Sequence, residues 1–252
     1  MASLSPMMQQ YFEMKKKHPD TILFFRLGDF YEMFYDDAKL VSKELGLTLT
    51  GRDCGQPERA PMCGIPFHSY ETYVAKLLAN GHKVAICEQM EDPKLAKGLV
   101  KRDIIRVITP GTVLEKSMLD ETRNNFICSL NVEGKRAGVC FADISTGELH
   151  ATLLAAKNKA EFEEQLQSEL SRFSPREILI NQGVLDLKDL PKFIKQRLSA
   201  SLEMLDDEKF DIGAAAPVLQ KQFNKTPEEL QLTDKPEICG ALGALLGYLK
   251  ET

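Results

Sequence analysis

The sequence predicts a mixed α/β protein of two domains, and three features of the 252-residue chain support this fold class. First, 43% of the residues are hydrophobic, which is enough apolar material for two ordinary cores. Second, short apolar runs typical of strands alternate with segments of helical periodicity along the whole chain. Third, three strand-like runs in the second half are joined by short turns, which makes them antiparallel neighbours.

Two helices in the first half are predicted from apolar spacing and from end signals. One covers Asp36 to Leu45, with acids in its first turn and Gly46 as its stop. The other begins near Ser69 and ends at Gly81, because its apolar residues recur at i, i+3, i+4, i+7 and i+8. Apolar runs predict strands at residues 22–26, 83–87 and 104–108.

The second half is predicted to begin with a three-stranded meander at residues 125–131, 138–144 and 148–154. Phe162, Leu166 and Leu170 then mark one face of a helix. The remaining predicted elements are a strand at 177–180, a helix at 190–198, a strand at 201–205 and a helix at 215–223. This order indicates a mixed sheet covered by helices.

The segment from Thr21 to Asp37 places a bulky aromatic residue, Phe30, two residues before an acid, Glu32. Alternate residues of an extended chain project to the same side, so Phe30 and Glu32 point at one target while Tyr31 points away. Gly28 permits a tight turn just before them, which puts Phe30 near a turn tip. The alternative is that Phe30 is a core aromatic residue on a buried strand.

Six segments of the chain resemble, in the same order, the amino-terminal region of the MutS family of DNA mismatch repair proteins. They are PMMQQY at 6–11, GDFYEMFYDDA at 28–38, PMCGIPFH at 61–68, VAICEQ at 84–89, VITPGT at 107–112 and DISTG at 143–147. The mismatch-reading signature of that family is a Phe-x-Glu triplet within GDFYE, which Phe30 and Glu32 match.

The resemblance implies four segments. They are a small mixed α/β mismatch-binding domain at residues 1–112, a linker at 113–124, a ribonuclease H-like connector domain at 125–235 and the start of a core-domain helix at 236–252. Apart from this first helix of the core domain, the core, lever, clamp and ATPase domains of the family have no counterpart in this sequence. We therefore expect an amino-terminal fragment that is not itself an enzyme.

The function that the resemblance implies is recognition of base mismatches and small insertion or deletion loops in duplex DNA. Phe30 would enter the minor groove, stack on a mispaired base and kink the duplex. Glu32 would take up a proton near the phosphates and donate a hydrogen bond to a base nitrogen, and Arg52 would contact phosphate. The family also places four further residues near the kinked step: Leu27, Asp29, Met62 and Pro66.

The two halves of the chain differ in charge. Residues 1–112 hold 15 Lys and Arg against 14 Asp and Glu, and residues 113–252 hold 17 against 23. Neither half is basic enough for a free-standing nonspecific DNA-binding protein, so we expect this chain to bind DNA only weakly by itself. The partners that the resemblance implies are mismatched duplex DNA, MutL at the connector domain, and a second subunit in a full-length homodimer, whereas the fragment can be monomeric.

The sequence has no nucleotide-binding loop. Its one Gly-Lys pair, Gly134-Lys135, is preceded at the required position by Ser129 and followed by Arg136, where the motif needs glycine and Ser or Thr. ATP and Mg²⁺ are therefore expected only in the family's ATPase domain, and no cofactor, metal or catalytic residue is expected here.

Two other functions remain as alternatives. A structure-specific ribonuclease H-like nuclease needs clustered carboxylates, but Asp143 is the only acid inside an apolar strand, and we expect it to bind the amides of the turn at 145–147. A protein-interaction module without direct DNA contact would bury Phe30 instead.

The six cysteines are not arranged as CxxC pairs, and we expect buried, reduced thiols. No apolar run approaches the roughly 20 residues that span a bilayer, and the first residues lack the apolar core of a signal peptide. A cytoplasmic protein without membrane contact is therefore expected.

Overall fold

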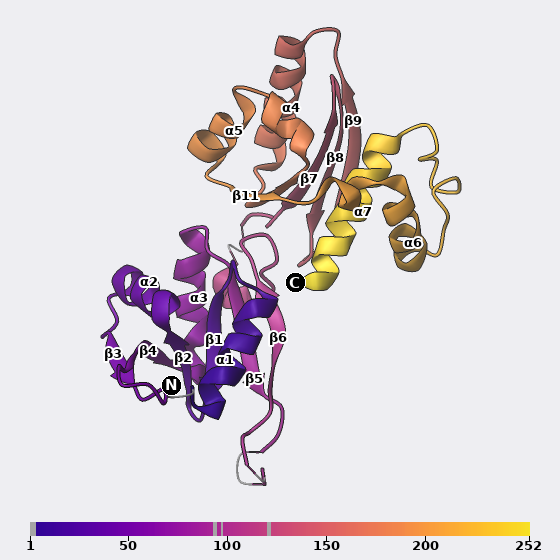
Figure 1. Cartoon of the computed structure of the whole chain (residues 1–252). Helices are drawn as coiled ribbons and strands as arrows, with labels where there is room; N and C mark the ends of the chain where they lie inside the picture. Colours follow the sequence, from indigo (N-terminus) through magenta and orange to yellow (C-terminus); the bar gives the residue numbers. More distant parts are fainter. Residues whose placement is uncertain (1–3, 93–94, 97, 120–121) are drawn as a thin grey trace. The chain divides into compact units, whose positions relative to one another are not determined.

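A computed structural model describes residues 4–92, 95–96, 98–119 and 122–252, so residues 120 and 121 of the expected linker lie outside the described part. The chain divides into two compact units, Met1–Thr109 and Pro110–Thr252 (Figure 1). Each unit contains a mixed sheet and helices, which confirms the predicted fold class. None of the helices formed by the described residues is both long and apolar enough to cross a membrane.

The first unit is built on a six-stranded sheet with the order β3-β4-β2-β1-β5-β6. The strands are β1 (Ile22–Leu27), β2 (Phe30–Phe34), β3 (Thr50–Arg52), β4 (Ala60–Pro66), β5 (Val84–Gln89) and β6 (Arg102–Ile108). The central strands β1 and β5 run parallel, and all other neighbours are antiparallel.

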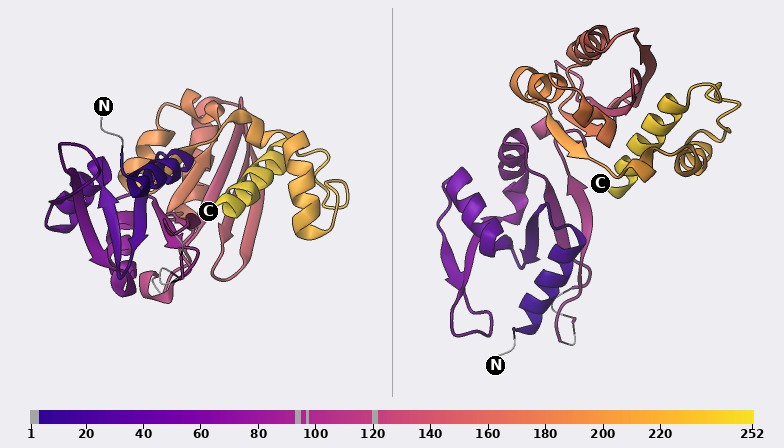
Figure 2. Two further views of the ribbon diagram at one scale, coloured as in Figure 1. Left: turned by 60° about the horizontal axis from the view of Figure 1, so that its bottom comes forward. Right: turned by 45° about the horizontal axis from the view of Figure 1, so that its top comes forward.

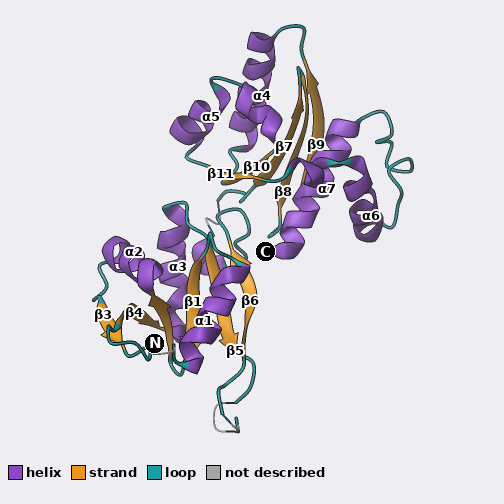
Figure 3. Cartoon of the chain, in the orientation of Figure 1, coloured by secondary structure: helices purple, strands orange, loops and turns teal. Residues whose placement is uncertain are grey.

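Helices lie on both faces of this sheet (Figure 3). They are α1 (Pro6–Lys17), α2 (Tyr35–Leu45) and α3 (Tyr70–Ala79), the last preceded by a short 3-10 turn, η1 (Phe67–Ser69). Helix α1 buries Met8, Tyr11 and Met14 against Leu23 and Phe25 of β1. Because side chains alternate in direction along a strand, the β1 residues on either side of Leu23 and Phe25 point to the other face of the sheet.

The second unit has a five-stranded sheet with the order β11-β10-β7-β8-β9. The strands are β7 (Ile127–Glu133), β8 (Arg136–Asp143), β9 (Glu148–Ala155), β10 (Glu177–Ile180) and β11 (Ser201–Met204). Strands β7, β8 and β9 form the predicted antiparallel meander, and β10 and β11 extend it in parallel with β7. This meander followed by alternating helices and strands is the element order that the sequence predicts.

Two helical layers cover the second sheet. One layer holds α4 (Lys159–Phe173) and α5 (Leu190–Phe193), which continues as a π-helical turn, η4 (Ile194–Leu198). The other holds α6 (Ile212–Phe223) and α7 (Pro236–Glu251). Three short 3-10 turns complete the description of this unit: η2 (Lys116–Met118), η3 (Gln182–Asp186) and η5 (Asp207–Phe210). The predicted apolar stripe of α4, formed by Phe162, Leu166 and Leu170, is completely buried.

Helix α7 differs from the expectation that residues 236–252 begin a further domain. The helix lies along the second sheet beside α6 (Figure 2), and its apolar residues share a core with Cys140 of β8. Gly138 of β8 permits this approach, because a Cβ atom there would lie 2.0 Å from the Glu237 carbonyl oxygen. Residues 236–251 therefore complete the core of the second unit.

Two glycines of α7, four residues apart, provide a matched test of this packing. A Cβ atom at Gly243 would lie 2.3 Å from Cβ of Ala215 in α6, whereas one at Gly247 would have no atom within 4 Å. We expect Gly243→Ala to lower the free energy of unfolding by about 1 to 2 kcal/mol, because overpacking exceeds the gain in helix propensity. Gly247→Ala should instead be neutral or stabilising. Urea unfolding of both variants tests this, and equal effects would contradict the close packing of α6 and α7.

The Glu237 carboxylate links the start of α7 to β8 and predicts a pH dependence. It is 4% exposed and accepts hydrogen bonds from the Arg136 guanidinium, which lowers the pKa of Glu237 below its ordinary value of 4.5. A folded-state pKa below the unfolded one gives stability that is complete above the unfolded pKa and is lost as the pH falls through the folded pKa. The unfolding free energy should therefore decline in acid below about pH 4.5, and Glu237→Gln should remove part of this decline. The control is Glu251→Gln, at a 62% exposed side chain, which should not.

Candidate nucleic-acid interface

Strands β1 and β2 form a hairpin that presents Phe30 at its turn. Leu27 pairs with Phe30, which leaves Gly28 and Asp29 as a two-residue connection. Gly28 has a φ of 58°, a left-handed conformation that glycine adopts without strain. The Phe30 side chain is 48% exposed and Tyr31 is 4% exposed. The structure therefore excludes the interpretation of Phe30 as a buried core residue.

Six of the seven predicted site residues share one face of the first sheet. Directly opposed residues of paired antiparallel strands lie on the same face. The register opposes Phe30 to both Leu27 and Pro66, and Glu32 follows Phe30 by two residues. It also opposes Phe34 to Met62 and Met62 to Thr50, two residues before Arg52. We call this set the hairpin face: Leu27, Phe30, Glu32, Arg52, Met62 and Pro66.

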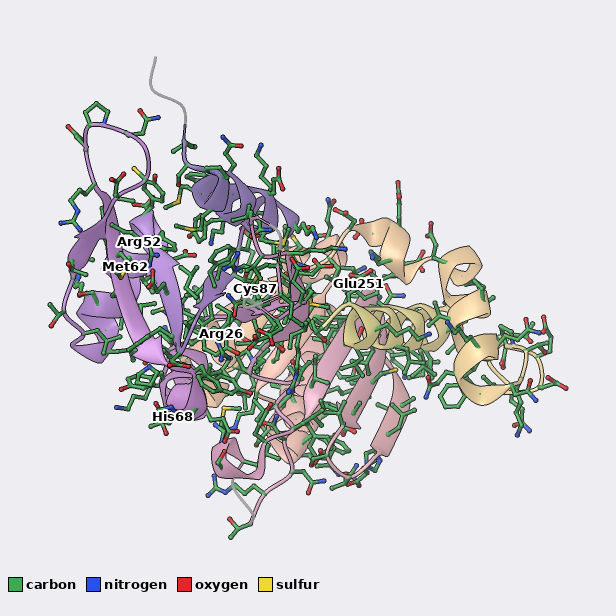
Figure 4. The ribbon with its side chains drawn as sticks, turned by 90° about the horizontal axis from the view of Figure 1, so that it is seen from below. Arg26, Arg52, Met62, His68, Cys87 and Glu251 are labelled. Atoms are coloured by element: carbon green, nitrogen blue, oxygen red, sulfur yellow. The ribbon has the colours of Figure 1, made fainter. Side chains whose placement is uncertain are left out.

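Asp29 lies in the turn itself and is exposed. Its carbonyl oxygen accepts a hydrogen bond from the Phe67 backbone amide at 3.0 Å, which ties the turn to the segment after β4. Arg52 and Met62 lie near one another on the outer strands of the sheet (Figure 4). The backbone of the turn is thus held, while the Asp29 side chain stays at the surface.

Glu32 and Arg52 form an ion pair, which the sequence did not indicate. The Arg52 guanidinium donates to Oε2 of Glu32, and the two side chains are 36% and 13% exposed, respectively. The pair joins β2 to β3 across the intervening strand β4. Glu32 is therefore not an isolated carboxylate in the free protein. Its partner Arg52 is the same residue that the sequence predicts to contact phosphate.

A second cluster fixes the hairpin, mostly from the opposite face, and it was missed from the sequence; its Arg102 lies on the face covered by α1, beside Phe25 and Gln10. The Arg26 guanidinium stacks on the Phe67 ring, with Cζ 3.5 Å from the ring centroid. Its Nε donates to the Gly28 carbonyl oxygen at 2.5 Å, and its Nη1 lies 3.3 Å from Oε1 of Glu88. Arg26 thus joins the turn, the segment after β4 and strand β5. We call the set Arg26, Tyr31, Phe67, Glu88 and Arg102 the turn clamp.

Tyr31 and Arg102 complete the turn clamp. The Tyr31 hydroxyl donates to Oε1 of Glu88. Burial is the larger cause that raises the pKa of Tyr31, and this hydrogen bond raises it further. Nε of Arg102 donates to the Arg26 carbonyl oxygen at 2.8 Å. These contacts join residues up to 76 positions apart, so no local sequence signal could have revealed them.

Asp143 has the structural role that the sequence predicts. Its carboxylate is 1% exposed and accepts hydrogen bonds from the Ser145 amide at 2.9 Å, the Ser145 hydroxyl at 2.6 Å and the Asn125 amide at 3.1 Å. Within the described ranges, no three His, Cys, Asp or Glu residues form a group that could hold a metal ion.

The six cysteines are free and buried, as the sequence predicts. Burial raises the pKa of Cys63 to about 11 and that of Cys87 to about 12. Both thiols of the first unit's sheet are therefore neutral at physiological pH.

Comparisons with known proteins match the two units in turn. The family model MutS domain I matches residues 5–117, and MutS domain II matches residues 125–252. The DNA mismatch repair protein MutS of Acetivibrio thermocellus is 48% identical over 252 residues, and that of Ruminiclostridium cellulolyticum is 46% identical. The alignments cover 100% of this chain and 28% of each relative, so the chain spans under a third of their length.

Among solved structures, T. thermophilus RuvC in complex with a Holliday junction substrate aligns with a TM-score of 0.36 and 10% identity. The alignment covers 50% of this chain and 94% of RuvC. With both MutS domain models matched in order and close to half of all positions identical to full MutS proteins, the chain belongs to the MutS family and comprises its domains I and II.

Proposed function

We propose that the first unit recognises mismatched and unpaired bases in duplex DNA by inserting the Phe30 ring beside them, as a step of DNA mismatch repair. The observation that carries this proposal is the 48% exposed Phe30 at a turn whose neighbours, Tyr31 and Met33, are buried. A ring on an ordered hairpin needs little further ordering when it binds, so less binding energy is lost to conformational entropy.

The energetics of the duplex supply the discrimination. Unstacking a normal base step costs about a few kcal/mol. A mismatched base has already lost part of its pairing and stacking energy, so less remains to be lost there. Inserting Phe30 and kinking the duplex therefore costs less at a mismatch than elsewhere. Because deformability and not a base-edge code is sensed, one site serves many different mismatches.

The ion pair between Glu32 and Arg52 prepares the hairpin face for a polyanion. Before DNA binds, Arg52 balances the charge of Glu32. Near phosphates the Arg52 guanidinium gains a second acceptor, and the charged form of Glu32 becomes unfavourable. Glu32 then takes up a proton and donates a hydrogen bond to a base nitrogen next to the Phe30 ring.

Substitution of Glu32 tests this role. Glu32→Gln should retain most of the binding, because the amide still donates a hydrogen bond, yet it should change the ratio of mismatch to homoduplex affinity by up to about tenfold. The measurement is competition binding at a fixed salt concentration. The control Glu58→Gln removes the same charge from an exposed position of the same unit and should leave the ratio unchanged. Wild-type discrimination in both Glu32→Gln and Glu32→Ala would contradict the proposed contact.

The remaining functions belong to a longer MutS subunit, and we propose them on the family's pattern. ATP hydrolysis and most of the dimer contacts would lie outside these two units. The second unit would contact MutL, which agrees with the excess of acids over bases in residues 113–252, because an acidic surface disfavours contact with a duplex.

The test of the proposed function compares mismatched and fully paired duplexes of equal length at a stated salt concentration. A full-length MutS subunit that contains this chain should prefer the mismatch, and this chain alone should bind both duplexes weakly. Equal affinity of the full-length subunit for the two duplexes would overturn the proposal. Incubation of the chain with Mg²⁺ or Mn²⁺ and branched DNA should give no cleavage.

A further inference from the structure

Four arginines line one cavity of the second unit, at the amino ends of its three parallel strands. The cavity has a volume of about 470 Å³ and is lined by Arg123, Asn124, Phe126, Arg172, Phe173, Ser174, Arg176, Arg197 and Leu198. Arg123 precedes β7, Arg176 directly precedes β10, and Arg197 lies in the helical turn before β11. None of these lining residues is acidic.

The charges around this arginine cavity do not balance. Arg172 and Arg197 lie in the last turns of α4 and η4, and each helix carboxyl end supplies about half a negative charge. Glu169 lies 3.7 Å from Arg172, and Glu148 accepts a hydrogen bond from Asn124 rather than from a lining arginine. Without Arg123, the contacts of the described residues give three guanidinium groups against one carboxylate and two helix ends, which leaves about one positive charge.

This concentration of positive charge contrasts with the rest of the unit. Residues 113–252 carry 17 basic and 23 acidic residues, yet four of the basic ones meet at this cavity. All four arginines are exposed, and the Arg172 side chain is 72% exposed, so water screens their mutual repulsion, while an anion in the hollow would interact favourably with each of them.

The wall of the cavity is apolar and rigid. Phe173 stacks on Phe141 with ring centroids 4.1 Å apart, and Phe126 meets Phe173 edge-on at 5.2 Å. Ser174, at a φ of 46°, turns the chain from α4 towards β10, and its hydroxyl donates to the Ser171 carbonyl oxygen at 2.9 Å. The arginines are therefore presented from an ordered frame.

We propose that this cavity binds the polyphosphate group of a small molecule. Planar guanidinium groups bind phosphate oxygens through two parallel hydrogen bonds, and several arginines around one hollow suit more than one phosphate. The volume falls in the range of small-molecule sites. A duplex is disfavoured, because it needs an extended basic surface and this unit is acidic overall. The site is independent of the hairpin face and of the proposed mismatch recognition.

Calorimetric titration of the 252-residue chain with inorganic tripolyphosphate, in magnesium-free buffer, tests the proposal. We expect one site per chain, and a loss of affinity of about tenfold or more in Arg176→Gln and in Arg197→Gln. Arg197→Lys keeps the charge without the planar fork and should lose less than Arg197→Gln. The matched control is Lys221→Gln, an exposed residue of α6 on the opposite sheet face, which should change affinity less than about twofold.

Parallel titrations distinguish the sources of the ligand. If ATP binds at least as tightly as tripolyphosphate and depends on the same arginines, the ligand is a nucleotide. Such binding would not indicate an ATPase site, because the sequence has no phosphate-binding loop. The proposal is overturned if tripolyphosphate does not bind, or if Lys221→Gln weakens it as much as the arginine variants. It is equally overturned if only duplex DNA or a glutamate-rich peptide binds in an arginine-dependent way. Circular dichroism of each variant verifies that it is folded.

Discussion

Phe30→Ala should remove the preference of a full-length MutS subunit for mismatched DNA. Stacking of an aromatic side chain on a base contributes about 1 to 3 kcal/mol, so mismatch affinity should fall about 5- to 150-fold. Affinity for paired DNA should change little, because the ring does not enter an intact step. The ratio of the two affinities, measured by competition at fixed salt, should therefore approach one.

The position of Phe30 makes this experiment clean. Its side chain is 48% exposed, so its truncation should affect the fold little. The matched control is Ile105→Ala on β6, which removes a 57% exposed apolar side chain from the same unit, outside the hairpin face. If Phe30→Ala keeps the mismatch preference, or Ile105→Ala loses it equally, the ring is not the inserting group.

Arg26→Met should loosen the hairpin that carries Phe30. The substitution removes the stacking on Phe67, the hydrogen bond to Gly28 and the ion pair with Glu88, whose side chain is 24% exposed. Together these losses should lower the local stability of the β1–β2 hairpin by about 2 to 3 kcal/mol. Hydrogen exchange of the backbone amides in β1 and β2 should accelerate accordingly.

Two substitutions of Arg26 distinguish the contribution of its charge from that of its planar guanidinium group. Arg26→Lys keeps the charge but not the planar group, so its exchange rates should lie between those of the wild type and Arg26→Met. The control Lys39→Met breaks an exposed ion pair with Asp36 on α2 and should change stability by less than about 0.5 kcal/mol. Wild-type exchange in Arg26→Met would show that the turn holds its shape without the clamp. If the clamp also positions Phe30, mismatch preference should weaken in step with the exchange rates.

Elements with strong local signals were predictable from the sequence. The helix α3 and the strands β7, β8 and β9 appear where apolar periodicity and turn residues place them. The helix α1 was not predicted, because its three buried residues are interspersed with glutamine and lysine. Strand β4 gave no clear signal either, since it contains two prolines and a glycine, which argue against a strand when read alone.

A buried charged residue could likewise not be recognised from the sequence alone. Glu177 reads as an ordinary strand residue, yet it is completely buried and accepts hydrogen bonds from the Tyr248 hydroxyl at 2.7 Å and the Gly111 amide at 3.0 Å. Its partners come from α7 and from the segment before η2. Only the packing of α7 on the second sheet brings these groups together.

The sequence by itself determined that Phe30 and Glu32 project to one side of a strand that begins at a turn, since alternation and a left-handed glycine are properties of the local backbone. The tertiary structure alone decided that Arg52 pairs with Glu32, that Arg26 stacks on Phe67, and that four arginines meet at one cavity. These side chains lie far apart along the chain, and they meet only after strands pair in register and helices pack on the sheets.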